Sequence, residues 1–451
     1  MQNPESKRKA KKPPPPNPIH AAVATWLSKV PQHLCEHLAA QVPRRWTVYE
    51  PMVLLPAGAF STTAWEAALR EGGQQRAGEL WQSILAGISR KTGRKGGLLT
   101  HLAVNEGIPL YASGAGGDGT EERISGDGGG GGGGVGNGNI LRSPSGLRML
   151  YGDFGPSSPA VPEGDGDECA AEGFFFERAL WVSTRQNGIF QTWAPRWTMF
   201  SRGNIKEKAR LLDFHRWPRE EEQQLGSEEN NGSGNGDERR RLSHRASVPS
   251  SRLREAWAVD LYAGIGYFVF SYAKQGMRVL GWELNPWSVE GLRRGAEGNG
   301  WSVKVVRGLE LARPTAEILA GGEQIVVFLE DNAHAAKRVR ELRSYGVGLE
   351  VLHVNCGLLP TSEVVWRDAW DIARGEGEQA WLHLHENVGV ADIDRRKGEI
   401  EEWFTALATS EKDQSPTRQA RVEHAELVKT YAPGVWHCVF DVYIQKSSSI
   451  T

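Results

Sequence analysis

Cysteine is scarce in this chain, and the few cysteines lie far apart. The four are Cys35, Cys169, Cys356 and Cys438, and none is close to another in sequence. This spacing offers neither a pair of zinc ligands nor the framework of a disulfide-rich protein. Histidines and carboxylates show no metal-ligand spacing either. We therefore expect no metal, and a protein of a reducing compartment, the cytoplasm.

Long apolar runs and an excess of one charge are also missing. No run is long enough to span a membrane, and the Lys/Arg- and Pro-rich N-terminus lacks the apolar core of a secretory signal. The formal net charge is only −2. This balance excludes a globally basic nucleic-acid-binding protein, so that any contact with phosphates must come from a local basic patch.

The apolar residues that are present, 39% of 451, suffice for two sizeable cores. A basic, proline-rich tail over 1–20 is expected to be disordered. A smaller α+β region follows over 21–173, interrupted by a glycine-rich insertion at 114–139 that cannot form a packed core. The larger domain covers 174–451 and carries a charged insertion at 219–250, which is also expected to be disordered.

Strands and helices alternate through the larger domain. Apolar runs predict strands at Ala256–Leu261, Met277–Glu283, Gln324–Glu330, Leu349–Asn355 and Trp381–Glu386. Val303–Val306 is ambiguous between a strand and an insertion, and Arg421–Ala432 and Trp436–Ile444 read as a closing hairpin. The alternation predicts an α/β fold with a doubly wound, mostly parallel sheet. With its C-terminal antiparallel hairpin, this fold suits the class I S-adenosylmethionine-dependent transferases better than a plain dinucleotide-binding domain.

A tight turn containing glycine follows the first of these strands. The strand ends near Asp260, Gly264 and Gly266 bracket Ile265, and an apolar helical pattern comes next. Glycines let the backbone approach a ligand, and the free N–H groups of a helix N-terminus face it. The turn alone is a weak signal, because Val269 stands where a dinucleotide-binding fingerprint has its third glycine.

Polar residues at the ends of the following strands add to this signal. Glu283 ends the second strand, where a carboxylate can accept hydrogen bonds from both hydroxyls of a ribose. Asp331 and Asn332 end the next clear strand and are candidates for contacts with an adenine ring, and Asn355 ends the fourth. Since parallel strands present their carboxyl ends at one edge, we expect these residues to lie together. The alternative is an ordinary strand–helix–strand unit with a solvated Glu283.

Two further features can be explained by a structural role alone. Ser201 precedes a helix that is predicted to begin near Asn204, so that it either caps the helix or faces a ligand. His383 and His385 alternate on a predicted strand and therefore share one face, for which a structural role is favoured over metal ligation.

The segments that carry these residues form an ordered set. They are MFSRGNIKEKAR (199–210), VDLYAGIGYF (259–268), WELNPWSVE (282–290), EDN (330–332), VNCGLLPTSE (354–363), HLHENV (383–388) and YAPGVWHCVFDV (431–442). The set resembles the wybutosine-synthesising tRNA 3-amino-3-carboxypropyltransferases, relatives of the tRNA guanine N1-methyltransferases. The resemblance covers about 174–444, and the insertions look like additions to the family pattern, which suggests a divergent fungal member.

The resemblance implies S-adenosylmethionine as co-substrate and tRNA, specifically phenylalanine tRNA, as partner. The family's cofactor positions correspond here to Ser201, Lys208, Glu283, Asp331 and Asn332, and Lys208 is expected to pair with the cofactor carboxylate. From their place at the strand ends, Asp260, Gly264 and Gly266 join this list of cofactor-binding candidates.

The implied reaction transfers the aminocarboxypropyl group to 4-demethylwyosine, a tricyclic guanosine derivative 3′ of the anticodon, and releases methylthioadenosine. The methyl-transferring relatives carry Asn-Leu-Pro after the fourth strand, whereas this chain has a longer segment from Asn355 to Pro360, which favours the larger group. They also place a general-base glutamate where Glu207 stands, so Glu207 and Asn355 are candidate catalytic residues. The alternatives are methyl transfer to guanine in the same tRNA and a tRNA-binding scaffold without catalysis.

Overall fold

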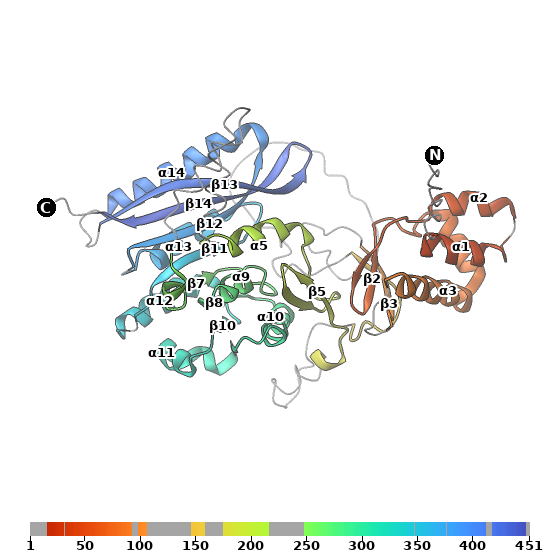
Figure 1. Cartoon of the computed structure of the whole chain (residues 1–451), viewed down its shortest axis with the longest axis horizontal. Helices are drawn as coiled ribbons and strands as arrows, with labels where there is room; N and C mark the ends of the chain where they lie inside the picture. The colour runs from red at the N-terminus through yellow and green to blue at the C-terminus, as the bar shows by residue number, and fades with distance from the viewer. Residues whose placement is uncertain are drawn as a thin grey trace, which may run out of the picture. The chain divides into compact units, whose positions relative to one another are not determined.

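The structure is a computed structural model of the chain, and it describes residues 16–30, 32–92, 98–105, 146–157, 175–215, 248–346, 348–375, 377–411 and 417–447. Its contacts divide the chain into two units, Met1–Ser183 and Thr184–Thr451 (Figure 1). The sequence predicts this division about ten residues earlier, at 173/174. The glycine-rich insertion at 114–139 and nearly all of the insertion at 219–250 lie outside the described residues.

The first unit combines helices with a small mixed sheet. Its helices are α1 (Pro18–Leu27), α2 (Gln32–Ala40) and α3 (Thr63–Thr92), and its strands are β1 (Thr47–Tyr49), β2 (Met52–Leu55), β3 (His101–Asn105) and β4 (Leu147–Tyr151). The sheet order is β1-β2-β3-β4, with β2 and β3 parallel and the other pairs antiparallel. A core that includes Trp65, Trp81 and Ile84 packs between them. The expected smaller α+β region is confirmed.

One helix of this unit begins earlier than expected, and another is kinked. Helix α1 begins at Pro18, inside the predicted tail, because Asn17 accepts a hydrogen bond from the Ile19 N–H and proline suits the first helical turn. Gly73 interrupts helix α3 with φ 71° and ψ 170°. The positive φ of this kink suits glycine.

The second unit is built on an eight-stranded sheet in the order β13-β14-β12-β11-β7-β8-β10-β9. Its strands are β7 (Trp257–Asp260), β8 (Arg278–Trp282), β9 (Val303–Val306), β10 (Ile325–Phe328), β11 (Val351–Cys356), β12 (Gln379–Gly389), β13 (Arg418–Ala432) and β14 (Val435–Lys446). Strands β7 to β12 pair in parallel, and β14 is antiparallel to both β12 and β13. The predicted fold class is thus confirmed, and the ambiguous segment Val303–Val306 is the edge strand β9.

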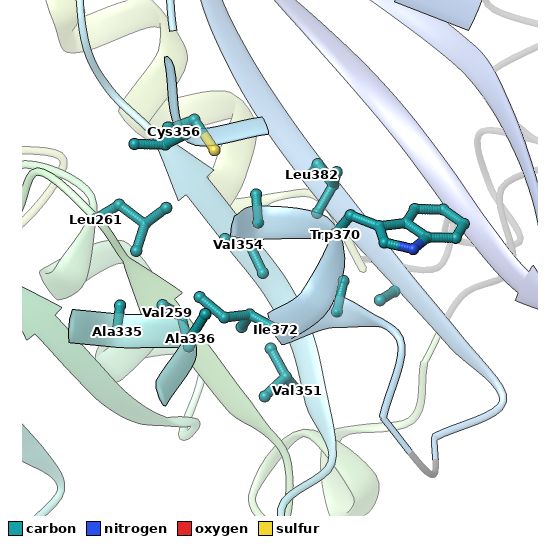
Figure 2. Packing of buried hydrophobic residues seen from close by; sticks show 14 of the residues in the cluster. Val259, Leu261, Ala335, Ala336, Val351, Val354, Cys356, Trp370, Ile372 and Leu382 are labelled. Carbon is teal, nitrogen blue, oxygen red and sulfur yellow. The ribbon is translucent and has the colours of Figure 1, made fainter. Parts of the chain in front are cut away.

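Helices cover both faces of this sheet (Figure 1). They are α5 (Ile205–Leu212), α8 (Ser250–Leu253), α9 (Val269–Lys274), α10 (Pro286–Gly298), α11 (Thr315–Ile318), α12 (Ala335–Ser344), α13 (Trp366–Ala373) and α14 (Ile393–Ser410). Successive side chains of a strand point to opposite faces. Val259 accordingly belongs to the same buried cluster as Ala335 of α12 and Trp370 of α13 (Figure 2), whereas Ala258 belongs to the cluster that includes residues of α9 and α10. The central strands are therefore buried on both sides.

A two-stranded sheet precedes α5. It consists of β5 (Val182–Gln186) and β6 (Ile189–Trp193), joined by Asn187 and Gly188. Both joining residues have positive φ, 52° and 72°, as a tight two-residue hairpin requires. This hairpin places two glutamines, Gln186 and Gln191, beside α5.

Candidate active site

The carboxyl edge of the parallel strands gathers most of the predicted site residues. Asp260 ends β7, Glu283 follows β8, Asp331 and Asn332 follow β10, and Asn355 lies near the end of β11. These four strands are consecutive neighbours in the sheet. They therefore bring together residues that are up to 95 positions apart in the sequence, as between Asp260 and Asn355.

The glycine-containing turn after β7 is fixed to Glu283. Gly264 and Gly266 have φ values of 52° and 87°, and a Cβ on Gly266 would lie 2.5 Å from Phe270 Cζ. The Gly264 N–H donates to Glu283 Oε2 at 2.9 Å, and the Asn285 N–H donates to Oε1 at 2.8 Å. Each carboxylate oxygen keeps acceptor capacity after these bonds. Glu283 is thus held in a fixed orientation with room to accept two ribose hydroxyls.

Asp260 is fully buried and links β7 to β11. Its Oδ1 accepts from the Tyr262 N–H at 3.1 Å and from Asn355 Nδ2 at 3.2 Å. Asp260 Oδ2 and Asn355 Oδ1 have no hydrogen-bond partner among the described residues. Burial raises the pKa of Asp260 to about 7. The pair forms a buried polar centre beneath the glycine turn and links that turn to β11.

The loop after β10 is organised by its polar residues. Asp331 accepts from the Ala333 N–H at 2.8 Å, and Asn332 Nδ2 donates to the Leu261 carbonyl at 2.8 Å. Asn332 therefore ties this loop to the glycine turn. Glu330 accepts from Arg338 and from Trp282 Nε1, so this neighbouring acid is structural. The side chain of Asp331 is exposed at the edge, where a ring amino group could reach it.

The segment before α5 is tied to the glycine turn through Tyr267. The Ser201 N–H donates to the Tyr267 hydroxyl at 2.9 Å, and this hydroxyl donates to the Met199 carbonyl at 2.6 Å. A short 3₁₀ turn, η1 (Arg202–Asn204), leads into α5. The side chain of Ser201 makes no capping hydrogen bond to this turn, so of the two interpretations the cap is wrong. Ser201 lies beside the cofactor-binding candidates of the glycine turn.

Lys208 is buried against the β5–β6 hairpin. Its Nζ donates to Gln186 Oε1 at 2.6 Å and to Gln191 Oε1 at 2.8 Å. The same atom lies 5.2 Å from the ring centre of Phe200 and 5.4 Å from that of Tyr267. Burial lowers the pKa of Lys208 to about 7. Neutral acceptors and aromatic rings thus surround this lysine.

Glu207 is engaged by an arginine one turn later on α5. Both of its oxygens accept from Arg210, at 2.7 and 2.8 Å, and the side chain is fully buried. Arg210 also donates to both oxygens of Asp441 on β14, at 2.6 and 2.9 Å. Glu207 could remove a proton from a substrate only after leaving Arg210. Its contacts hold α5 on the sheet.

A buried line of histidines extends from Asp441 across the same face. His383 Nδ1 lies 2.8 Å from Asp441 Oδ1, His353 Nδ1 lies 2.9 Å from His383 Nε2, and His215 Nε2 lies 2.8 Å from His353 Nε2. A carboxylate only accepts hydrogen bonds. His383 therefore donates to Asp441, and each ring further along the line can donate to the ring before it. His385 pairs separately with His437 at 2.9 Å. Sequence reasoning missed these partners; only the alternation of His383 and His385 signalled a shared face.

The residues at this edge fit S-adenosylmethionine. Glu283 is oriented for a ribose, its carboxylate is bonded to the backbone of the glycine turn at Gly264, and two lysines of this unit, Lys208 on α5 and Lys429 on β13, have no ion-pair partner in the described part of the chain. No group of histidines, cysteines and acids that could hold a metal occurs among the residues that the structure describes. Within those same ranges, no helix has the length and apolarity to cross a membrane.

Comparisons with known proteins agree with this site, although no family model matches the chain. The tRNA wybutosine-synthesizing protein 2 of Schizosaccharomyces pombe is 34% identical over 402 residues, which are 89% of this chain and 72% of that protein. The protein of the same name from Saccharomyces cerevisiae is 30% identical over 434 residues, covering 91% and 75%.

A solved structure supports the fold. It is Pyrococcus horikoshii TYW2 in complex with MeSAdo, which matches 95% of this chain and 100% of its own chain with a TM-score of 0.50 at 15% identity. At this identity the likeness concerns the fold alone. The sequence similarity to the two fungal proteins decides the assignment: the chain belongs to the tRNA wybutosine-synthesizing protein 2 family.

Proposed function

We propose that the protein transfers the 3-amino-3-carboxypropyl group of S-adenosylmethionine to 4-demethylwyosine in phenylalanine tRNA, and that it acts in the cytoplasm. The observation that carries this proposal is the 34% identity to a tRNA wybutosine-synthesizing protein over 89% of the chain. The site geometry supports it, because the carboxyl edge offers one place for each part of the co-substrate.

Each part of this edge has a proposed role. Glu283 accepts from the ribose hydroxyls, Asp331 and Asn332 contact the adenine, and Gly264 and Gly266 form the turn against which the cofactor lies. Ser201 contacts the methionine arm. Asp260, held by Asn355, supports this turn from beneath through the Tyr262 N–H. The protein's own contribution is positioning, which can supply a large share of a rate enhancement.

The chemistry itself comes from the sulfonium of S-adenosylmethionine, whose bond to the side-chain methylene breaks as its electron pair returns to sulfur. The methylene bonds to a ring carbon of the acceptor, and that carbon loses its proton. The products are the substituted tricyclic base, methylthioadenosine and a proton. Because Arg210 occupies both oxygens of Glu207, we assign Glu207 to positioning α5 and let the proton leave to solvent.

By-product analysis tests the proposal. The purified protein is incubated with S-adenosylmethionine and tRNA from cells that lack this activity, and the nucleosides are separated and weighed by mass spectrometry. We expect methylthioadenosine in equal amount to the modified base. S-adenosylhomocysteine in its place would assign methyl transfer. If the protein binds tRNA but neither binds nor consumes the co-substrate, it is a scaffold instead.

A further inference from the structure

Lys429 lies at the Ser201 turn although the two residues are 228 positions apart in sequence. It belongs to β13 of the C-terminal hairpin. Its Nζ donates to Ser201 Oγ at 3.0 Å and to Asn204 Oδ1 at 3.3 Å. Gly203 makes the space for it, because a Cβ at that position would overlap Lys429 Cδ. The turn is thus shaped around the lysine side chain.

The charge of Lys429 is not balanced by an acid. It forms no ion pair with any residue in the described ranges, and burial lowers the pKa of its ammonium group. The acid at a nearby position of the same strand, Glu426, is taken by Lys206 at 2.6 Å. A partly buried cation without a counter-charge is unfavourable. An anion bound beside Ser201 would remove this cost.

Lys208 makes a different set of contacts. Its two hydrogen bonds go to Gln186 and Gln191, and only 2% of its surface is exposed. Its ring contacts with Phe200 and Tyr267 bring it near the Ser201 turn, but it donates no hydrogen bond to Ser201, whereas Lys429 donates to the Ser201 hydroxyl directly. Of the two lysines, Lys429 is therefore the one that contacts the Ser201 side chain, and the hydrogen bonds of Lys208 hold the β5–β6 hairpin against α5.

We propose that Lys429 is the residue that pairs with the carboxylate of the methionine arm, with the Ser201 hydroxyl as its second contact. This inference rests on the proposed function. The partial burial of Lys429 favours a co-substrate carboxylate over an RNA phosphate, which would be met at the exposed surface. With the arm held from the side of β13, Lys429 becomes a positioning residue for the group that is transferred. The serine hydroxyl, which accepts from Lys429 and donates to Asn204 Oδ1 at 3.3 Å, would then turn its hydrogen from Asn204 to the carboxylate.

Calorimetric titration with two ligands tests this inference. S-adenosylmethionine carries the carboxylate, and methylthioadenosine has the same adenosine and sulfur but no amino-acid arm. The variant Lys429→Met removes the charge and keeps the apolar stem. We expect its affinity for S-adenosylmethionine to fall about ten- to a hundredfold, as for a lost charge-assisted hydrogen bond. Its affinity for methylthioadenosine should change less than about threefold.

Lys206→Met is the matched control, since Lys206 is a neighbouring lysine that already has an acidic partner. Both of its affinities should equal those of the unchanged protein. The proposal fails if Lys429→Met loses neither ligand or both equally, if Lys208→Met shows the selective loss instead, or if Lys429→Met loses only tRNA binding. Absence of S-adenosylmethionine binding by the unchanged protein would overturn the proposed function itself, and the inference with it.

Discussion

At the scale of single residues, the geometry around Glu283 explains how one carboxylate can define a nucleoside site. Two backbone N–H groups fix its two oxygens, so the side chain is oriented before any ligand arrives. Its place could be predicted from the sequence, because an acid at the tip of a parallel strand needs only the strand itself to be recognised.

We expect Glu283→Ala to weaken binding of S-adenosylmethionine by about 2 to 3 kcal/mol, because two ribose hydroxyls lose a charged acceptor. Methylthioadenosine contains the same ribose and should lose as much, in contrast to the selective effect expected at Lys429. Calorimetric titration measures both affinities. Glu297→Ala, a substitution at an exposed position of α10, should leave both affinities unaltered. An unchanged affinity of Glu283→Ala for methylthioadenosine would rule out the ribose contact.

The position of the Lys429 side chain beside Ser201 could not be predicted from the sequence. Sequence patterns identify β13, but its pairing with β14 shifts register between Leu427 and Lys429. A shift of one residue turns side chains to the other face. The choice between Lys208 and Lys429 beside Ser201 therefore depends on an irregularity that no local pattern encodes.

At the scale of elements, α5 is fastened to the sheet by buried charges. Arg210 joins Glu207 of its own helix to Asp441 of β14, and both acids are fully buried. The strands could be predicted because apolar runs are strong local signals. The link between Arg210 and Asp441 could not be predicted, because the two residues are 231 positions apart and each looks like an ordinary charged residue in the sequence.

We expect Asp441→Asn to lower the free energy of unfolding by about 3 kcal/mol, since it removes one partner of a buried arginine and a charged acceptor of His383. The ion pair between Lys206 of α5 and Glu426 of β13, in which the lysine is exposed, provides a comparison, and Glu426→Gln should cost less than Asp441→Asn. Urea unfolding measures both. Equal costs for the two variants would show that burial does not strengthen the Arg210 link.

At the scale of the whole molecule, the sheet collects buried titratable groups whose pKa values burial shifts. Burial lowers the pKa values of His353 and His385 well below the usual range and that of His437 to about 4. It raises the pKa of Glu283 and brings that of Asp260 to about 7. The two sets act on stability with opposite sign.

The expected dependence of stability on pH follows from counting protons. Below about pH 6.5 the unfolded chain protonates the three histidines while the folded protein keeps them neutral, which favours unfolding. Asp260 opposes this effect, because the folded protein keeps its proton up to about pH 7, whereas the unfolded chain releases it above about pH 4. The raised pKa of Glu283 acts in the same direction as that of Asp260. The three protons that the histidines take up on unfolding outnumber those that the two acids release, so stability should fall as the pH decreases below about pH 6.5.

Urea unfolding at several pH values between about pH 6.5 and 4.5 measures this slope. His437→Gln removes one of the three histidines, and a glutamine can still hydrogen-bond to His385. The variant should therefore lose less stability on acidification than the unchanged protein, by about 1.4 kcal/mol for each pH unit, because it takes up one proton fewer on unfolding. A protein whose stability stayed constant or rose on acidification, with no difference between it and His437→Gln, would show that these three histidines take up protons in the folded state.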